Sequence, residues 1–352
     1  MTDEQPRRTW ATMKDVARHA GVSLSTVSYV LNDSGPVAAP RRERVLEAVR
    51  VLGYTPNEAG RSLKRRAMST VGMVVPELSN PYFALVVEGV ERAASGRDAL
   101  LVLCAPEAEG ATGSAETVAR LLRSRRLSGV VYITGTTTDP EAVASLTSLG
   151  PVVLVDEQLP ALNLPAVVSD NRKGAREMAA HVLARGHTRV AVIGGPSNLW
   201  TAQQRLAGYR DAFAAAGLDP QRVPVLEGDY RERSGSVLAR KLLDVPADRR
   251  PTVLICANDL MAIGALDYAR NVGLTVPDDL GVVGFDDLPF SRVLTPRLTT
   301  VRQPAHDLGR RAGELLFAAI DGGSTGNGIM ETVPPLDTEV QIRDSVGAPP
   351  PV

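Results

Sequence analysis

The sequence predicts an α/β protein with a small three-helix head and a larger body of two doubly wound, parallel-sheet subdomains. Residues 10–56 show three short helical patterns and no strand pattern. From residue 70 to residue 343, continuous apolar runs of four to six residues alternate with helical stretches. Continuous apolar strands separated by helices are typical of parallel sheets that helices cover on both faces.

The number of apolar runs favours two sheets over one, because one parallel sheet seldom needs so long a chain. The predicted strands are Val71–Val75, Ala99–Leu103, Val130–Ile133, Val152–Val155, Val190–Ile193, Val253–Cys256 and Val282–Phe285. Helical patterns lie between them, for example at Tyr82–Ala94, Gly174–Ala184 and Met261–Asn271.

Composition narrows the class of protein. At 352 residues, with 44% hydrophobic and 22% charged residues, the chain is typical of a globular protein of two or three domains. No apolar run approaches the ~18 residues of a membrane-spanning helix, and the polar N-terminus lacks the apolar segment of a secretory signal. Cys104 and Cys256 stand in apolar stretches, which favours buried free thiols over a disulfide. Together these features predict a cytoplasmic protein.

The head is basic and the body acidic. Residues 1–66 hold 12 Lys and Arg against 7 Asp and Glu, whereas the rest of the chain holds 27 against 33. A basic head on an acidic body favours a polyanionic partner for the head.

The head begins with a helix, a turn and a second helix. Thr12 can cap the first helix, and Asp15 three residues later completes a capping box. Gly21-Val22-Ser23 then breaks the pattern, and Ser23 can cap a second helix over residues 24–31. This arrangement is typical of a helix-turn-helix.

The third helix of the head is predicted from about Pro40 to Leu52, with Gly53 as the residue that ends it. Its apolar stripe is Val45, Leu46, Val49 and Leu52.

In a helix-turn-helix, the second helix enters the major groove of DNA and its outward residues reach base edges. The outward residues here are Leu24, Ser25 and Tyr29, with Thr26 and Ser28 nearer the phosphate backbone. The alternative is a small helical bundle with solvated hydroxyl groups.

A short basic segment follows the head. Asn57 can cap a helix that runs to about Lys64, which has too few turns to be stable alone. Leu63 is an isolated apolar residue among basic ones. Its side chain could insert between base pairs from the minor groove and kink the DNA. The alternative is a tethering linker with an incidental leucine.

Polar residues directly follow several predicted strands of the body, where ligands of doubly wound sheets bind. They are Asp156, Asn258-Asp259, Asp286-Asp287, and Gly194-Gly195-Pro196, which leads to Trp200, Thr201 and Arg205. Carboxylates, an amide and a guanidinium beside aromatic rings suit a polyhydroxylated ligand. At any single position, helix capping by Asp or Asn is the alternative.

Other kinds of site have little support. No GxGxxG or GxxxxGK[ST] motif occurs, and the four histidines are scattered along the chain. We therefore predict no cofactor, no metal ion and no catalytic residues.

A series of motifs runs through the chain in a fixed order. They are Thr12-Met13-Lys14-Asp15-Val16-Ala17, Ala20-Gly21-Val22-Ser23, Ser25-Thr26-Val27-Ser28, Val30-Leu31-Asn32, Leu52-Gly53-Tyr54-Thr55-Pro56-Asn57, Arg61-Ser62-Leu63, Asn80-Pro81-Tyr82-Phe83, Arg185-Gly186-His187, Arg205-Leu206-Ala207-Gly208-Tyr209, Asn258-Asp259, Gly284-Phe285-Asp286-Asp287, Leu298-Thr299-Thr300-Val301 and Arg343-Asp344-Ser345. The series resembles the lac repressor (LacI/GalR) family of transcription regulators from Thr12 to Ser345. The head motif is highly specific, and the body motifs are individually looser.

The resemblance implies a helix-turn-helix domain over 10–56, a hinge helix over 57–66 and an effector-binding and dimerisation domain over 70–343. The last would have the fold of periplasmic binding proteins, with one subdomain of about 70–168 and 303–333 and another of about 169–302 and 334–343. Residues 1–9 and 344–352 would be flexible tails.

The resemblance also implies the residues of two sites. The DNA contacts would be Thr12, Ser23, Leu24, Ser25, Thr26, Ser28, Tyr29, Asn32, Tyr54, Asn57, Arg61, Ser62, Leu63 and Lys64. The effector contacts would be Tyr82, Phe83, Asp156, Thr201, Arg205, Tyr230, Asn258, Asp286 and Gln303, to which we add Trp200 on chemical grounds.

The expected function is that of a transcription regulator, and we expect a repressor. It would bind a pseudo-palindromic operator in double-stranded DNA as a homodimer, and a sugar or sugar derivative would control the binding. Leu199 stands where purine-responsive relatives carry an arginine, which argues against a purine effector. The C-terminus has no leucine heptad, so we expect a dimer rather than a tetramer. A solute-binding module without DNA activity and a sugar-acting enzyme are the alternatives.

Overall fold

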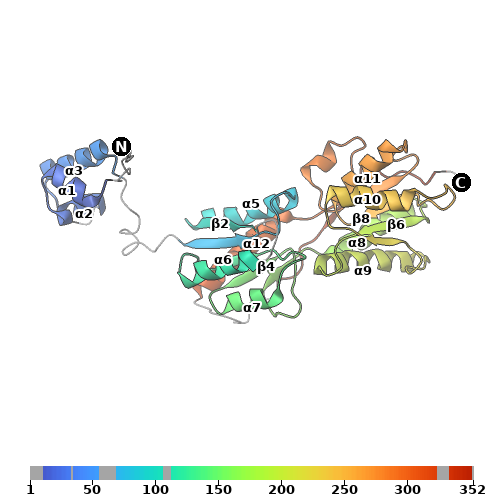
Figure 1. Ribbon diagram of the computed structural model, residues 1–352, viewed down its shortest axis with the longest axis horizontal. Coiled ribbons are helices and arrows are strands. Elements are labelled where there is room, and N and C mark those ends of the chain that lie inside the picture. The colour runs from blue at the N-terminus through green and yellow to red at the C-terminus, as the bar shows by residue number, and fades with distance from the viewer. Residues whose placement is uncertain (1–10, 33–34, 55–68, 106–111, 323–332, 351–352) are drawn as a thin grey trace, which may run out of the picture. The chain divides into compact units, whose positions relative to one another are not determined.

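The computed structural model describes residues 11–32, 35–54, 69–105, 112–322 and 333–350 (Figure 1). They fall into two compact units, Met1–Ser69 and Thr70–Val352. We refer to these units as the head and the body.

The head contains helices α1 (Met13–Ala20), α2 (Leu24–Asn32) and α3 (Ala39–Leu52). The predicted capping box of α1 is confirmed, since Thr12 accepts a hydrogen bond from the Asp15 amide and Asp15 accepts one from the Thr12 amide. The Ser23 hydroxyl accepts from the Thr26 amide at the start of α2. Gly53 ends α3 with a left-handed φ of 58°.

The core of the head differs from its prediction at one position of α3. Leu46 was predicted to face inward but is 49% exposed, whereas Ala48 is fully buried beside Val45. A small alanine carries a weak hydrophobic signal, which is why the sequence pattern misplaced the stripe. The buried core residues are Val16, Ala17, Ala20, Val27, Val30, Val45, Ala48 and Tyr54.

The first lobe of the body is a five-stranded parallel sheet in the order β2-β1-β3-β4-β5. Its strands are β1 (Thr70–Val74), β2 (Leu100–Cys104), β3 (Val130–Tyr132), β4 (Val152–Val155) and β5 (Ala166–Val167), and its helices are α5 (Pro81–Ser95), α6 (Thr112–Arg123), α7 (Pro140–Thr147) and α12 (Ala305–Asp321). Figure 1 shows α12 beside α5, although it follows the second lobe in sequence. The two helices touch at Gly309, where a Cβ would lie 1.9 Å from the Val86 carbonyl oxygen.

The second lobe is a four-stranded parallel sheet in the order β7-β6-β8-β9. Its elements are α8 (Asn171–Ala184), β6 (Val190–Gly194), α9 (Trp200–Ala215), β7 (Val225–Glu227), α10 (Glu232–Leu243), β8 (Val253–Cys256), α11 (Asp259–Asn271), β9 (Gly281–Val283) and the 3₁₀ turn η1 (Pro289–Arg292). An antiparallel pair, β10 (Thr300–Arg302) and β11 (Glu339–Gln341), lies beside the end of β9 and the segment after it, where isolated bridges join Val283 to Thr299 and Asp286 to Arg302. The predicted pair of parallel sheets is thus confirmed.

Two further observations concern the cysteines and the apolarity of the helices. Cys104 and Cys256 are buried free thiols, as their apolar surroundings predicted. Within the ranges that the structure describes, no helix has the length and apolarity needed to cross a membrane.

Candidate functional site

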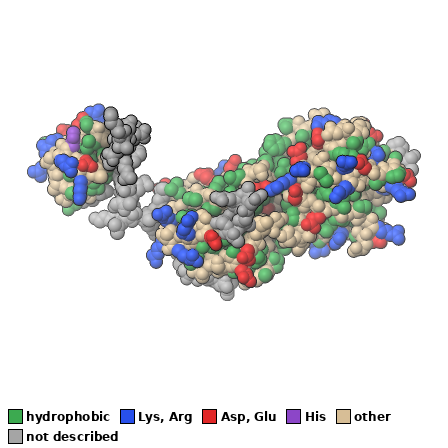
Figure 2. Space-filling view, viewed as in Figure 1, with side chains coloured by type: hydrophobic (Ala, Val, Ile, Leu, Met, Phe, Trp, Pro, Cys, Tyr) green, Lys and Arg blue, Asp and Glu red, His purple; other side chains and the backbone are tan. Residues whose placement is uncertain are grey.

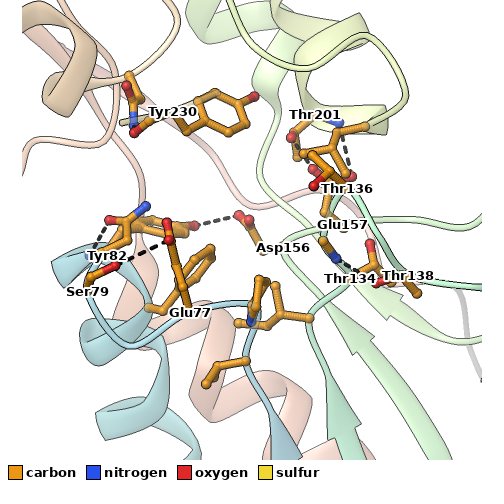
Figure 3. Close-up of a pocket in the computed structure, with 18 of the residues that line it drawn as sticks. Glu77, Ser79, Tyr82, Thr134, Thr136, Thr138, Asp156, Glu157, Thr201 and Tyr230 are labelled. Carbon is orange, nitrogen blue, oxygen red and sulfur yellow. Dashed lines mark hydrogen bonds between the residues drawn. The ribbon is translucent and has the colours of Figure 1, made fainter. Parts of the chain in front are cut away.

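A cavity of about 680 Å³ lies where the carboxyl ends of the two sheets meet (Figure 3). The first lobe contributes the segments that follow β1, β3 and β4, and the second lobe contributes those that follow β7, β8 and β9. The start of α9 completes the lining with Thr201 and Arg205. This is the edge at which the sequence placed its candidate ligand residues.

Arg205 is the central cation of the cavity and is only 4% exposed. Its Nε donates to Asn171 Oδ1 at 2.7 Å, and its Nη1 donates to the carbonyl oxygen of Ala257 at 2.6 Å. The guanidinium carbon lies 4.0 Å from the centre of the Phe285 ring. These contacts fix the guanidinium plane without help from a ligand.

Asp286 faces Arg205 across 3.6 Å, measured from Oδ1 to Nη1. Gln303 Nε2 donates to the same oxygen at 2.8 Å. Burial raises the pKa of Asp286 to about 8, an effect that Arg205 opposes. Gln303 therefore positions Asp286, but it is not among the residues that line the cavity.

Asp156 enters the cavity from the end of β4 and is 7% exposed. The hydroxyl group of Tyr82 donates to its Oδ1 at 2.6 Å. Tyr82 lies at the start of α5, where its own amide donates to the capping residue Asn80, and its ring packs edge-on against Phe83. Burial raises the pKa of Asp156, and the hydrogen bond from Tyr82 opposes this.

Glu157 is a cavity residue that the sequence analysis missed. It is 3% exposed and accepts hydrogen bonds from both the amide and the hydroxyl group of Thr201. Burial and the neighbouring Asp156 raise the pKa of Glu157 to about 7. In an extended strand, successive side chains point to opposite faces, but the left-handed φ of 69° at Asp156 lets both carboxylates line the cavity. The only signal in the sequence was the position of Glu157 next to Asp156.

Tyr230 and Asn258 interact at the ends of β7 and β8. Asn258 Nδ2 donates to the Tyr230 carbonyl oxygen at 2.9 Å, and Asn258 Oδ1 accepts from the Met261 amide as the cap of α11. Asn258 therefore both caps a helix and lines the cavity. The Tyr230 ring lies over Gly195, where a Cβ would come within 2.4 Å of the ring.

The polar pairs Asn258-Asp259 and Asp286-Asp287 each place their first residue in the cavity lining and their second outside it. Asp259 accepts hydrogen bonds from Ser291, Thr300 and the Leu288 amide. Asp287 forms ion pairs with three arginines, Arg292, Arg302 and Arg343. Neither carboxylate lines the cavity, and both hold the segments that position Asp286.

Eight of the ten expected effector residues line the cavity: Tyr82, Phe83, Asp156, Thr201, Arg205, Tyr230, Asn258 and Asp286. Gln303 lies behind Asp286, and Trp200 is a half-buried residue outside the lining. Its neighbour Thr201 lines the cavity instead, so an effector contact by Trp200 stays a prediction. Polar lining residues that the sequence analysis missed include Glu77, Thr134, Thr136, Thr138, Asp229 and Arg231.

Three polar contacts join the lobes across the cavity. Thr201 bonds Glu157, Asn198 Nδ2 donates to the Thr136 carbonyl oxygen at 2.8 Å, and Arg231 Nη2 lies 3.2 Å from Glu77 Oε2. In the part of the chain that the structure describes, no group of three or more His, Cys, Asp and Glu side chains is arranged to hold a metal ion.

In the head, the outer face of α2 carries exposed side chains of the expected DNA site. Leu24 and Tyr29 are 45% and 49% exposed, and the Ser23 hydroxyl bonds those of Ser25 and Thr26 at 2.8 Å. Lys and Arg side chains are spread over the visible face of the head in Figure 2.

The structure places one further expected DNA contact, Tyr54, differently. Tyr54 is only 6% exposed and packs in the core of the head instead of standing on its outer face. The side chain of Asn32 and residues Asn57, Arg61, Ser62, Leu63 and Lys64 lie outside what the structure describes.

Comparison with known proteins supplies the family. Residues 12–57 match the family described as bacterial regulatory proteins, lacI family, and residues 179–346 match the periplasmic binding protein-like domain. Over 348 residues the chain is 34% identical to the HTH-type transcriptional repressor CytR of Escherichia coli (strain K12), with 98% of each chain covered. The chain belongs to the LacI family.

Further similar proteins are also transcription regulators. The repressor PurR of Aliivibrio fischeri (strain MJ11) is 33% identical over 338 residues, which are 96% of this chain and 98% of PurR. The structure of the lac repressor dimer bound to operator and the anti-inducer ONPF matches with a TM-score of 0.81 at 27% identity, over 97% of this chain and 100% of that one. The CelR–cellobiose complex matches with a TM-score of 0.69 at 32% identity, over 95% and 99%. This LacI-family chain is a DNA-binding transcriptional repressor and not an enzyme.

Proposed function

We propose that this repressor binds a pseudo-palindromic operator as a homodimer in the cytoplasm, and that a sugar or sugar derivative bound in the cavity controls the binding. The observation that carries the effector part is the convergence of Asp156, Arg205, Asn258 and Asp286, from both lobes, on one cavity. A ligand that bonds residues of both lobes changes the free energy of one lobe arrangement relative to another.

The chemistry of the lining supports a hydroxylated ligand. Carboxylate oxygens accept hydroxyl hydrogens, the Asn258 amide and the Arg205 guanidinium donate, and the rings of Tyr82, Phe83 and Tyr230 offer apolar faces. Leu199 lines the cavity with an apolar side chain, which offers a purine no hydrogen bond. CelR, a similar protein, has been solved with cellobiose.

The exposed face of α2 supports operator reading. Leu24, Ser25 and Tyr29 stand on the helix that follows the turn, which is the one that enters the major groove in this motif. The similar lac repressor was solved as a dimer on operator.

A self-association face is available on the edge strand β2. Leu100 and Val102 point to one face of β2 and are 52% and 37% exposed, whereas Leu103 points to the other face and is 44% exposed. An edge strand that exposes large apolar residues favours burial against a partner. We assign this face to a second copy of the chain.

Selection of bound duplexes from random DNA by the purified protein, near physiological salt, tests the proposal. A palindrome should be enriched, and one member of a sugar panel should change the affinity for it. If no sequence is enriched with or without sugars, the head does not bind DNA sequence-specifically and the proposal fails.

The hinge segment provides a second test. Leu63→Ala should weaken specific operator binding by about 2 kcal/mol, because it removes an apolar wedge between base pairs, while salt-driven nonspecific binding stays nearly unchanged. Leu63→Met, which keeps an apolar side chain, is the matched control. Titrations against operator and random duplex measure both affinities, and equal losses in the two would rule out the wedge.

A further inference from the structure

The cavity has an excess of acidic side chains. Its described lining includes five carboxylates and two guanidiniums, but neither lysine nor histidine. The carboxylates belong to Glu77, Asp156, Glu157, Asp229 and Asp286, and the guanidiniums to Arg205 and Arg231.

Both guanidiniums already have acidic partners. Arg205 faces Asp286 at 3.6 Å and is held by Asn171 and the Ala257 carbonyl oxygen. Arg231 pairs with Glu77 at 3.2 Å at the mouth of the cavity, where its side chain is 67% exposed. A phosphate group would therefore compete with a carboxylate for either cation.

Asp156 and Glu157, in contrast, have no cationic partner within ion-pair distance among the described residues. Their hydrogen-bond donors are neutral: the Tyr82 hydroxyl for Asp156, and the amide and hydroxyl group of Thr201 for Glu157. Both carboxylates are more than nine-tenths buried. Each oxygen can accept more than one hydrogen bond, so both retain capacity on the side of the cavity.

Burying two adjacent carboxylates without a cation is unfavourable unless they stay protonated or a cation joins them. Burial accordingly raises the pKa values of both carboxyl groups. The pKa of Glu157, about 7, lies in the physiological range. The charged and titratable groups that face Glu157 are Asp156, Arg205 and Tyr230.

We propose that the effector carries a protonated amine, which Asp156 and Glu157 bind from one side of the cavity, so that its class is a hydroxylated amine such as an amino sugar. This inference rests on the proposed sugar-binding function of the same cavity. An ammonium group donates up to three charge-assisted hydrogen bonds and supplies the cation that the two carboxylates lack. A neutral sugar can donate hydroxyl hydrogen bonds to the carboxylates but supplies no counter-charge, and a phosphorylated sugar adds charge of the same sign.

The test uses matched hexoses whose terminal carbon carries a hydroxyl, an ammonium or a phosphate group. Calorimetric titration of the full-length protein, over several hexose stereochemistries, measures affinity for each trio. The amine should bind at least about tenfold more tightly than its hydroxyl counterpart, and the phosphate should not bind detectably. Equal or tighter binding of hydroxyl or phosphate members overturns the proposal, and so does the absence of binding by every amine.

A pH series distinguishes an ammonium from any other tight ligand. An ammonium favours ionised Glu157, so its affinity should rise about tenfold from about pH 6 to about pH 8, a range in which a primary alkylamine stays protonated. Glu157→Gln should remove most of this rise and weaken amine binding about tenfold, whereas hydroxyl members change little. Asp286 also titrates in this range, but it is present in both the unaltered protein and Glu157→Gln. The difference between their two pH profiles of amine affinity therefore reports on Glu157 alone.

Glu141→Gln is the matched control, because it makes the same chemical change on an exposed side chain of α7 outside the cavity. An amine affinity that is independent of pH, or equally affected by both substitutions, contradicts the assignment. Operator selection is measured separately. If the protein enriches a palindrome but prefers neutral sugars, the proposed function stands and only the proposal of an amine effector fails.

Discussion

At the scale of single residues, the cavity depends on unusual backbone conformations. Asp156, Tyr230 and Asp286 have φ angles of 69°, 67° and 116°, in the left-handed region that residues other than glycine seldom adopt. Such residues cost about 1–3 kcal/mol each and cluster where a site needs a particular side-chain direction. Here the three conformations place a hydroxyl-bearing ring and two carboxylates on one cavity.

The close contact between Gly195 and Tyr230 leads to a prediction about this cavity. In Gly195→Ala, the new Cβ would come within 2.4 Å of the Tyr230 ring and would displace it. We expect effector affinity to fall about tenfold or more, since the ring contributes a wall of the site. Calorimetric titration with the effector measures this.

Gly194→Ala is the matched control, because the nearest atoms to a Cβ there lie at 3.7 Å, an ordinary contact distance. If both variants bind the effector as the unaltered protein does, the ring is not part of the site.

Residue types at strand ends made much of the cavity predictable. Asp156 and Asp286 directly follow apolar runs, Asn258 caps a helix, and Arg205 lies in the second turn of α9. The structure brings all four together. Glu157 and the loop threonines could not be found in this way, because their inward direction depends on local backbone angles that nothing in the sequence specifies. Trp200 shows the converse case, since its residue type suits a sugar site but it lies outside the lining, next to Thr201, which belongs to it.

At the scale of elements, capping explains where helices begin. The Thr12 hydroxyl accepts from the Asp15 amide and donates to Asp15 Oδ2 at 2.6 Å, so α1 starts at a defined residue. The apolar strands β1, β4, β6 and β8 were equally predictable, because each is buried on both faces. The sequence analysis did not predict β5, β7, β10 and β11. Each has two or three residues and is not buried along its whole length, unlike the equally short β3 and β9, whose residues are all buried.

Thr12→Ala should destabilise α1 by about 1 kcal/mol, because the first turn loses its cap. Hydrogen exchange of the α1 amides in the full-length protein measures the change. Thr12→Ser keeps the hydroxyl group and should exchange at nearly the original rate. Comparable exchange in all three proteins would show that the capping box contributes no stability.

At the scale of the whole molecule, the two lobes are built from discontinuous sequence. Helix α12 returns to the first lobe after the second has been completed, and it packs on α5 with glycines at the contact. No local pattern predicts that return, and the family resemblance supplied it. The cavity therefore joins segments up to 212 positions apart, from Val74 to Asp286.

The proposed dimer yields a prediction on β2. Val102→Asp places a charge on the exposed apolar edge strand, and its burial in an interface would be strongly unfavourable. We expect a dimer-to-monomer shift in sedimentation velocity and a loss of operator affinity. Val237→Asp, on the exposed face of α10 in the second lobe, is the control that should leave the mass unchanged. A Val102→Asp protein that stays dimeric places the interface elsewhere.

The central claim is that occupancy of the cavity controls operator binding, and one measurement tests it most directly. Fluorescence anisotropy gives the affinity for the selected operator with and without the effector, for the unaltered protein and for Asp286→Asn. The account predicts that the effector changes operator affinity about tenfold or more in the unaltered protein and has little effect in Asp286→Asn. Without effector, the variant should bind the operator as tightly as the unaltered protein does. An effector that binds the cavity and leaves operator affinity unchanged would contradict the account.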